Sequence, residues 1–140
     1  MSRRHPQFNR ENLETELPKS GIEYVWVKDL GGHRKKQPGE SPNTALRNQS
    51  FRNYADYMLT PEFQGEAAEV LRRAESSPTA IMCAERMWFQ CHRMMVSDYY
   101  TAHGVEVEHI DGTGPTRRHQ LMKEAQVIDG RLLYNAGQLF

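Results

Sequence analysis

Apolar residues recur with helical periodicity in three parts of this sequence. In residues 50–59 the aromatic and aliphatic positions are three or four residues apart, so they share one face of a helix. Pro61 suits the first turn of a second helix that runs to about residue 74. The segment 91–103 predicts a third helix, which ends at Gly104.

Two charged segments have weaker helical patterns. Asn9 is placed to cap a helix that starts at Arg10 and stops at Gly21. The stretch 116–126 predicts a further helical segment. Residues 28–43, by contrast, are rich in glycine, lysine and proline, and they predict a long exposed loop.

The strands are predicted by shorter apolar runs. "IEYVWV" is rich in β-branched and aromatic residues, "TAIMCA" is an unbroken apolar run, and "VEVEHI" alternates. These runs are residues 22–27, 79–84 and 105–110. A run without a polar face fits a strand that is covered on both sides, as in a parallel sheet. "VIDGRLLY" adds a hairpin that turns at Asp129 and Gly130.

The order of these elements predicts the fold class. Helices that alternate with apolar strands favour an α/β domain with a mostly parallel sheet, because parallel neighbours need crossover connections. A chain of 140 residues has the usual size of one domain with one core. We therefore expect a single α/β domain over residues 1–140, in which residues 111–140 form a C-terminal hairpin and tail.

The charge balance excludes some classes of function. Lys and Arg number 18, as do Asp and Glu, so no global charge draws the protein to nucleic acid or to a membrane. No apolar run reaches the roughly 20 residues of a membrane helix, and no apolar stretch follows the basic N-terminus as in a signal peptide. We expect a cytoplasmic protein whose two cysteines are free thiols, because that compartment is reducing.

Residue types that carry chemistry cluster in the segment 83–93. Cys83 and Glu85 lie at the carboxyl end of the predicted strand 79–84. Ligands of α/β sheets bind beyond the carboxyl ends of the strands. The start of the next helix adds Cys91, His92 and Arg93. The dipole and first-turn N–H groups of a helix favour a bound phosphate or a thiolate there.

Three kinds of chemistry fit this cluster, and each competes with a structural role. Either cysteine is a candidate nucleophile, activated by His92 and the helix start, but free cysteine is often simply buried. Glu85 is a candidate acid or base, or else a charge partner of Arg93. As a metal site, Cys83, Cys91 and His92 could supply three ligands and Glu85 a fourth. Their spacing lacks the second ligand pair of a zinc signature, so we expect neither a metal nor another cofactor.

Two other segments carry groups that suit an anion. The first is basic and N-terminal, and consists of Arg3, Arg4, Gln7 and Asn9. These residues are candidate phosphate contacts, and a solvated charge run is the alternative. The second is the pair Gly31 and Gly32, a candidate phosphate loop for which an ordinary turn is the alternative.

Six short motifs carry a family resemblance. "SRRHPQFN", "YVWVKDLGG", "SFRNYADYMLTPEF", "IMCAE", "CHR" and "GVEVEHI", in this order and spacing, resemble the bacterial and archaeal family catalogued as domain of unknown function 488. The resemblance runs from Ser2 to about Ile110 and implies a small cytosolic Rossmann-like three-layer α/β domain. It also places the polar cluster of that family on Arg3, Arg4, Gln7, Asn9, Tyr24, Gly31, Gly32, Tyr54, Cys83, Glu85, Cys91, His92 and Arg93.

The same resemblance implies that the sheet is shortened at its N-terminal side. Members of the family begin with a strand that carries a Gly-His pair, a helix, and a second strand that ends in Asp-x-Arg. This chain starts at the Ser-Arg-Arg stretch that follows them. The sheet would then lack roughly 30 residues and expose an apolar edge. We therefore expect a homodimer, a poorly soluble monomer, or a chain whose start codon is placed too far downstream.

These residues together suggest a nucleotide or nucleic-acid component as the ligand. Its anionic group would rest against Arg3, Arg4 and Arg93. Glu85 or Cys83 would then perform the chemistry. The alternative is a non-catalytic ligand-binding or protein-interaction module, in which the same residues form a structural polar core.

The last residues of the chain suggest one protein partner. Gln138-Leu139-Phe140 resembles part of the Gln-Leu-x-Leu-Phe peptide by which bacterial proteins dock on the replication sliding clamp. One residue of that pattern is lacking, so an ordinary tail is the alternative.

Overall fold

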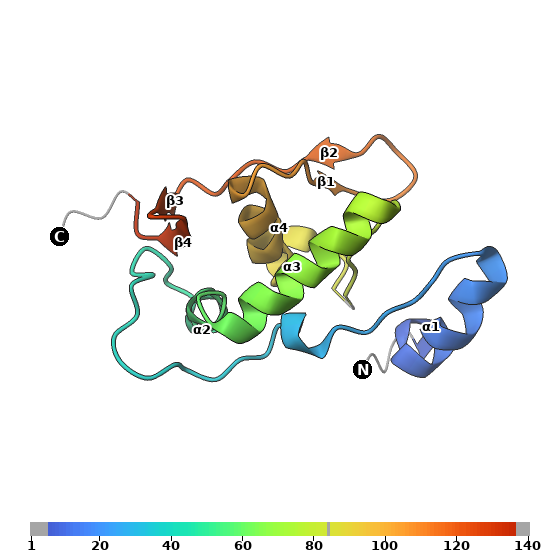
Figure 1. Cartoon of the computed structure of the whole chain (residues 1–140), viewed down its shortest axis with the longest axis horizontal. Helices are drawn as coiled ribbons and strands as arrows, with labels where there is room; N and C mark the ends of the chain where they lie inside the picture. Colours follow the sequence, from blue (N-terminus) through green and yellow to red (C-terminus); the bar gives the residue numbers. More distant parts are fainter. Residues whose placement is uncertain (1–5, 84, 137–140) are drawn as a thin grey trace.

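The computed structural model describes residues 6–83 and 85–136 (Figure 1). Its helices are α1 (Arg10–Glu16), α2 (Gln49–Tyr57), α3 (Pro61–Ser76) and α4 (Arg93–Ala102). Its strands are β1 (Glu108–His109), β2 (Arg117–Arg118), β3 (Ala125–Ile128) and β4 (Arg131–Tyr134). Short 3-10 helices lie at Pro6–Phe8, Leu17–Ser20, Lys28–Leu30 and Trp88–Gln90. Across these residues no helix is both long enough and apolar enough to span a membrane.

Helices α2, α3 and α4 pack around an aromatic and aliphatic core. Phe63 of α3 is fully buried, and its ring meets those of Tyr54 and Tyr99 edge-on, at centroid distances of 6.0 and 5.1 Å. Met95 of α4 is fully buried as well. Edge-to-face ring pairs add about 0.5–1.5 kcal/mol each to the free energy gained by burial. The core therefore lies between these three helices rather than against a sheet.

Polar side chains start two of the core helices. The Asn48 side chain accepts a hydrogen bond from the Phe51 N–H (3.1 Å), and Thr60 Oγ1 accepts one from the Phe63 N–H (3.4 Å). Caps of this kind stabilise a helix by about 1 kcal/mol. All three helices predicted from apolar periodicity are confirmed.

The sheets are small and antiparallel, so the predicted Rossmann-like α/β fold with a mostly parallel sheet is wrong. β1 pairs with β2 and β3 pairs with β4, as two separate ribbons. Residues 22–27 and 79–83 belong to neither ribbon. Met82, which a parallel sheet would bury, is 48% exposed. An apolar run becomes a strand only where another backbone pairs with it, and composition alone does not show whether one is available.

The region after α4 also differs from the prediction. Only Glu108 and His109 of the predicted strand 105–110 pair with β2. The helix predicted over 116–126 is wrong, because that segment contains β2 and the start of β3. His119 in its middle is 4% exposed. The backbone pairing of Arg117 and Arg118 with β1 replaces the helical hydrogen bonds there.

The ribbon β3–β4 is the predicted hairpin. Asp129 and Gly130 both have positive φ angles, 52° and 76°, as a two-residue type I′ turn requires. Tyr134 at its end is fully buried, and its N–H donates to Asn43 Oδ1 (2.9 Å). This bond ties the hairpin to the loop before α2.

The N-terminal segment lies to one side of the core helices. Figure 1 shows α1 apart from α2, α3 and α4, at the end of the extended connection 22–27. The helix predicted from Arg10 is confirmed as α1 followed by a 3-10 turn, and it stops at Gly21 with a φ of 75°. The Arg10 guanidinium lies 4.3 Å from the centre of the Trp26 ring.

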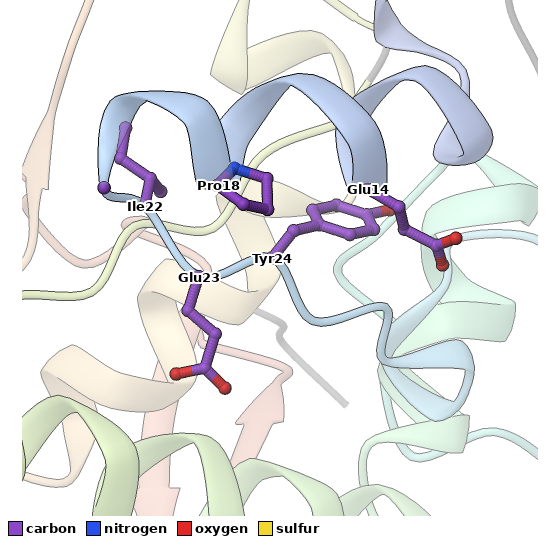
Figure 2. A pocket seen from close by; sticks show the side chains of 6 residues that line it. Glu14, Pro18, Ile22, Glu23 and Tyr24 are labelled. Atoms are coloured by element: carbon purple, nitrogen blue, oxygen red, sulfur yellow. The ribbon is translucent and has the colours of Figure 1, made fainter.

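A hollow of about 380 Å³ lies between α1 and this connection (Figure 2). It is lined by Glu14, Pro18, Gly21, Ile22, Glu23 and Tyr24. Each of its two carboxylates lies within ion-pair distance of an arginine, Glu14 of Arg10 (3.7 Å) and Glu23 of Arg73 (3.5 Å).

Candidate functional site

The segment 83–93 brings the two thiols together. Cys83 lies at the end of the extended stretch after α3, and Cys91 lies two residues before α4. Their Sγ atoms are 3.4 Å apart, the Cys83 thiol donates to the Cys91 sulfur, and both cysteines are free. Cys91 is 7% exposed, whereas Cys83 is only partly buried. We call these two residues the thiol pair.

Arg93 contacts the Cys91 sulfur with two donors. Its Nε lies 3.1 Å from Sγ, and its backbone N–H lies 3.4 Å away at the first residue of α4. The hydrogen bond from Cys83, helped by those from Arg93, lowers the pKa of Cys91 to about 6. The same bond raises the pKa of Cys83, because that thiol must keep its proton to donate it. Within the pair, these bonds favour the negative charge on Cys91 and the proton on Cys83.

Glu85 supports the thiol pair through its backbone. Its N–H donates to Cys83 Sγ (3.3 Å), and its carbonyl oxygen accepts a hydrogen bond from Arg93 Nη2. Its side chain is exposed. The carboxylate is therefore accessible from solvent.

His92 is enclosed by residues far away in the sequence. Its ring lies 5.3 Å from that of Tyr54, centre to centre, and a Cβ atom on Gly32 would come within 2.6 Å of its Nδ1. Burial first, and then the charges of Arg93, His33 and Arg34, lower the pKa of His92 to about 4. His92 is therefore neutral at pH 7. Gly32 is required here because a side chain would occupy the place of the imidazole.

Tyr54 of α2 and the two glycines predicted for the site have structural contacts. Tyr54 is buried, and its hydroxyl donates to the Leu30 carbonyl oxygen (2.8 Å). Gly31 donates its N–H to the Lys28 carbonyl and accepts a bond from Arg34 Nε (3.0 Å). These bonds hold the start of the long loop after Leu30 against α2. Gly31 and Gly32 thus form a packed turn next to His92.

The N-terminal candidates are only partly within the described residues. Gln7 is exposed in the 3-10 helix Pro6–Phe8, and Asn9 occupies the N-cap position of α1. Tyr24 lines the hollow of Figure 2. Arg3 and Arg4 lie outside the described residues, as does the tail Gln138-Leu139-Phe140.

A second polar cluster is buried beside α4, and the sequence reasoning missed it. Asp98 of α4 accepts hydrogen bonds from His119 Nε2 (2.6 Å) and from the Tyr134 hydroxyl (2.9 Å). His119 Nδ1 in turn lies 2.7 Å from His109 Nε2. The side chains of Asp98 and His119 are 0% and 1% exposed. We call His109, His119 and Asp98 the histidine row.

The histidine row meets the thiol segment at His109. The His109 ring stacks on Trp88 at a centroid distance of 3.8 Å and an angle of 4°, and Trp88 belongs to the loop between the two cysteines. Burial, followed by the charge of His119, lowers the pKa of His109, and Arg93 contributes in the same direction. His109 is therefore a neutral imidazole at pH 7, held in one orientation.

Two signals in the sequence point to this row. Asp98 falls three residues after Met95, next to the apolar face of its helix, and a buried carboxylate must find hydrogen-bond donors. His109 and His119 lie on either side of a turn with two glycines. Such a turn can bring two side chains together, but the sequence does not show which face they share. Within the described residues, no group of three His, Cys, Asp or Glu side chains is arranged to hold a metal.

One comparison with known proteins gave a match. The family model for the Domain of unknown function DUF488 matches residues 1–100. The chain belongs to the DUF488 family. In this DUF488 chain the match includes the thiol pair and Arg93, and it ends before His109 and His119. No curated protein and no solved structure matched the chain.

Proposed function

We propose that this DUF488 chain is an enzyme that uses the Cys91 thiolate on an anionic substrate, of the class of nucleotides or nucleic-acid components. The observation that carries this proposal is the position of Cys91 Sγ, 3.1 Å from Arg93 Nε and 3.4 Å from the Cys83 thiol. Both neighbours donate hydrogen bonds, and a thiolate is the reactive form of cysteine. Of the two cysteines, Cys91 is therefore the nucleophile in this proposal.

The charges around His92 support an anionic substrate. Arg93, His33 and Arg34 each disfavour the protonated form of His92, so they lie close enough for their positive potential to act there. Arg93 and Arg34 come from segments far apart in the sequence, the start of α4 and the long loop. A phosphate that binds between them would replace repulsion among cations by attraction.

The remaining residues have subsidiary roles in this proposal. The exposed Glu85 carboxylate is a candidate acid or base at the mouth of the site. Cys83 keeps the proton that it donates to Cys91 and so stabilises the thiolate. His109 is a second candidate base, because its ring is oriented by His119.

A non-catalytic interaction module is the second candidate function. The tight contact between Gly32 and His92 favours it, because such packing suits a structural polar core as well as a binding site. In that case no small anion would stabilise the protein, and the thiols would serve packing only.

A thermal-shift screen of nucleoside monophosphates, sugar phosphates and short oligonucleotides tests the proposal. A ligand that binds only the folded state raises the melting temperature, and inorganic phosphate alone shows how much of the effect comes from charge. We expect the shift to be lost in Arg93→Gln and kept in Arg72→Gln, a matched control whose arginine pairs with Glu69 on α3. Glu85→Gln should keep the fold and lose the ligand effect. No shift with any of these compounds, or equal shifts in both arginine variants, would favour the module.

A further inference from the structure

The thiol pair has the geometry of a reduced dithiol. Cys83 and Cys91 lie at the two ends of a short loop, with their sulfurs 3.4 Å apart. A disulfide bond is about 2.05 Å long, so the sulfurs need to approach by roughly 1.4 Å. The described residues between them form one 3-10 turn, Trp88–Gln90, and no α-helix or strand that would resist a movement of this size.

We propose that Cys83 and Cys91 are a peroxide-reactive pair that closes reversibly into an intramolecular disulfide. Cys91 is the residue that the peroxide oxidises, and Cys83 is the residue that resolves the product. This activity needs no nucleotide, although it uses the same sulfur as the proposed function. Closure of the disulfide would also remove the nucleophile, so a peroxide would switch the enzyme off.

The chemistry balances in two steps. The Cys91 thiolate attacks one oxygen of a hydroperoxide, the O–O bond breaks, and the departing alkoxide or hydroxide takes a proton from water, which leaves a sulfenic acid on Cys91. The Cys83 sulfur then attacks the Cys91 sulfur. The S–O bond breaks, and the hydroxide leaves with the Cys83 proton as water. Two thiols lose two electrons in total, and the peroxide gains them.

The surroundings assign these different roles to the two sulfurs. Arg93 donates to Cys91 from Nε and from its backbone N–H, so the negative charge resides on that sulfur. Cys91 is 7% exposed, which admits a molecule of the size of hydrogen peroxide more readily than a bulky disulfide. Cys83 is more exposed, so a reducing thiol attacks the disulfide there. Cys91 then departs, because the sulfur with the lower pKa is the better leaving group.

The experiment treats the full reduced chain with equimolar hydrogen peroxide, followed by iodoacetamide and mass spectrometry. We expect a product that has lost two hydrogens and takes up no iodoacetamide, and we expect dithiothreitol to restore both thiols. Peptide mapping should find Cys83 and Cys91 joined. Arg93→Gln should slow the reaction about tenfold, since less thiolate is present, whereas Arg72→Gln should not.

Single-cysteine variants separate the two steps. Cys83→Ser should stop at a sulfenic acid on Cys91 that dimedone traps, and Cys91→Ser should react at least about tenfold more slowly. If both thiols of the folded parent chain still react fully with iodoacetamide after the peroxide treatment, the proposal is overturned. Disulfide bonds that form only between molecules would also overturn it. These outcomes leave the proposed function intact, because the thermal shift by nucleotides is measured on reduced protein without peroxide.

Discussion

Residues 91–93 carry a thiol, an imidazole and a guanidinium in succession, and each has a different environment. Hydrogen bonds from Cys83 and Arg93 lower the pKa of Cys91 and favour its thiolate. Burial among cations lowers the pKa of His92 and favours its neutral form. Arg93 contributes to both effects from the first residue of α4. One arginine therefore lowers the pKa of a thiol and that of a histidine at the same time.

The titration of His92 predicts that the protein loses stability in mild acid. Its pKa is about 6.5 in the unfolded chain and about 4 in the folded one, so between these values only the unfolded state takes up the proton. The contribution of His92 to the free energy of unfolding is thus fully present above about pH 6.5, and it is lost as the pH decreases towards 4. The lowered pKa of Cys91 acts in the same direction at higher pH, between about 6 and 9.

Urea unfolding at pH 7.5 and pH 5 measures this effect. From pH 7.5 to pH 5, we expect the free energy of unfolding to fall by at most roughly 2 kcal/mol more in the parent than in His92→Gln, because glutamine does not titrate. The charged and titratable groups around His92 (Arg93, His33 and Arg34) are the same in both proteins. An identical decrease in the two proteins would show that His92 does not contribute to the pH dependence.

At the scale of elements, buried polar contacts hold the C-terminal ribbons on the helices. β1 and β2 pair over only two residues each, too few for a ribbon that is stable by itself. The position of β1–β2 therefore depends on His109 and His119, which connect it to Asp98 of α4. The same carboxylate holds β4 through Tyr134.

Asp98→Asn should destabilise the protein by roughly 2–5 kcal/mol, because the amide cannot accept every bond that the carboxylate accepts and leaves buried donors unpaired. Asp111→Asn is the matched control, since Asp111 is exposed after β1. Chemical unfolding measures the decrease in the free energy of unfolding. Hydrogen exchange at the amides of residues 117–119 shows whether β2 has separated from β1 and α4. Equal stability of the two variants would mean that the histidine row does not fix the ribbon.

At the scale of the whole molecule, the N-terminal segment is set apart from the core helices within the described residues. α1 lies apart from the core helices in Figure 1. Apolar side chains are exposed on this segment, and they are Phe8 (44%), Ile22 (51%), Val25 (43%) and Trp26 (54%). Exposed apolar groups that lie close together favour association. The homodimer predicted from the sequence would therefore form through this segment.

Sedimentation velocity of the variants Ile22→Ser and Ile110→Ser measures how each change affects association. The two isoleucines are 51% and 66% exposed, and only Ile22 belongs to the N-terminal segment. If the N-terminal segment mediates association, we expect Ile22→Ser to shift the chain towards monomer and Ile110→Ser to leave its sedimentation unchanged. A parent chain that sediments as a monomer at every concentration would contradict the expected homodimer. A shift in Ile110→Ser alone would place the contact on the turn after β1 instead.

The sequence by itself determined what depends on neighbours along the chain. Helices α2, α3 and α4 follow from apolar spacing and caps, and the β3–β4 turn follows from the backbone preferences of Asp129 and Gly130. Helix and turn contacts involve residues that are close along the chain, so the pattern is enough to predict them. The two cysteines and Arg93 also lie within a short segment, and they stay a predicted site.

Only the tertiary structure decided which distant segments meet. The parallel sheet was wrong because a strand needs a partner backbone, and "TAIMCA" has the composition of a buried strand whether or not one is present. The role of Cys91 as the charged sulfur depends on the direction of the Cys83 and Arg93 hydrogen bonds. The histidine row joins α4 to residues 11 and 21 positions further along, and no local pattern specifies that contact. Its formation follows from the high cost of burying the Asp98 carboxylate without donors, a cost that only the packed chain imposes.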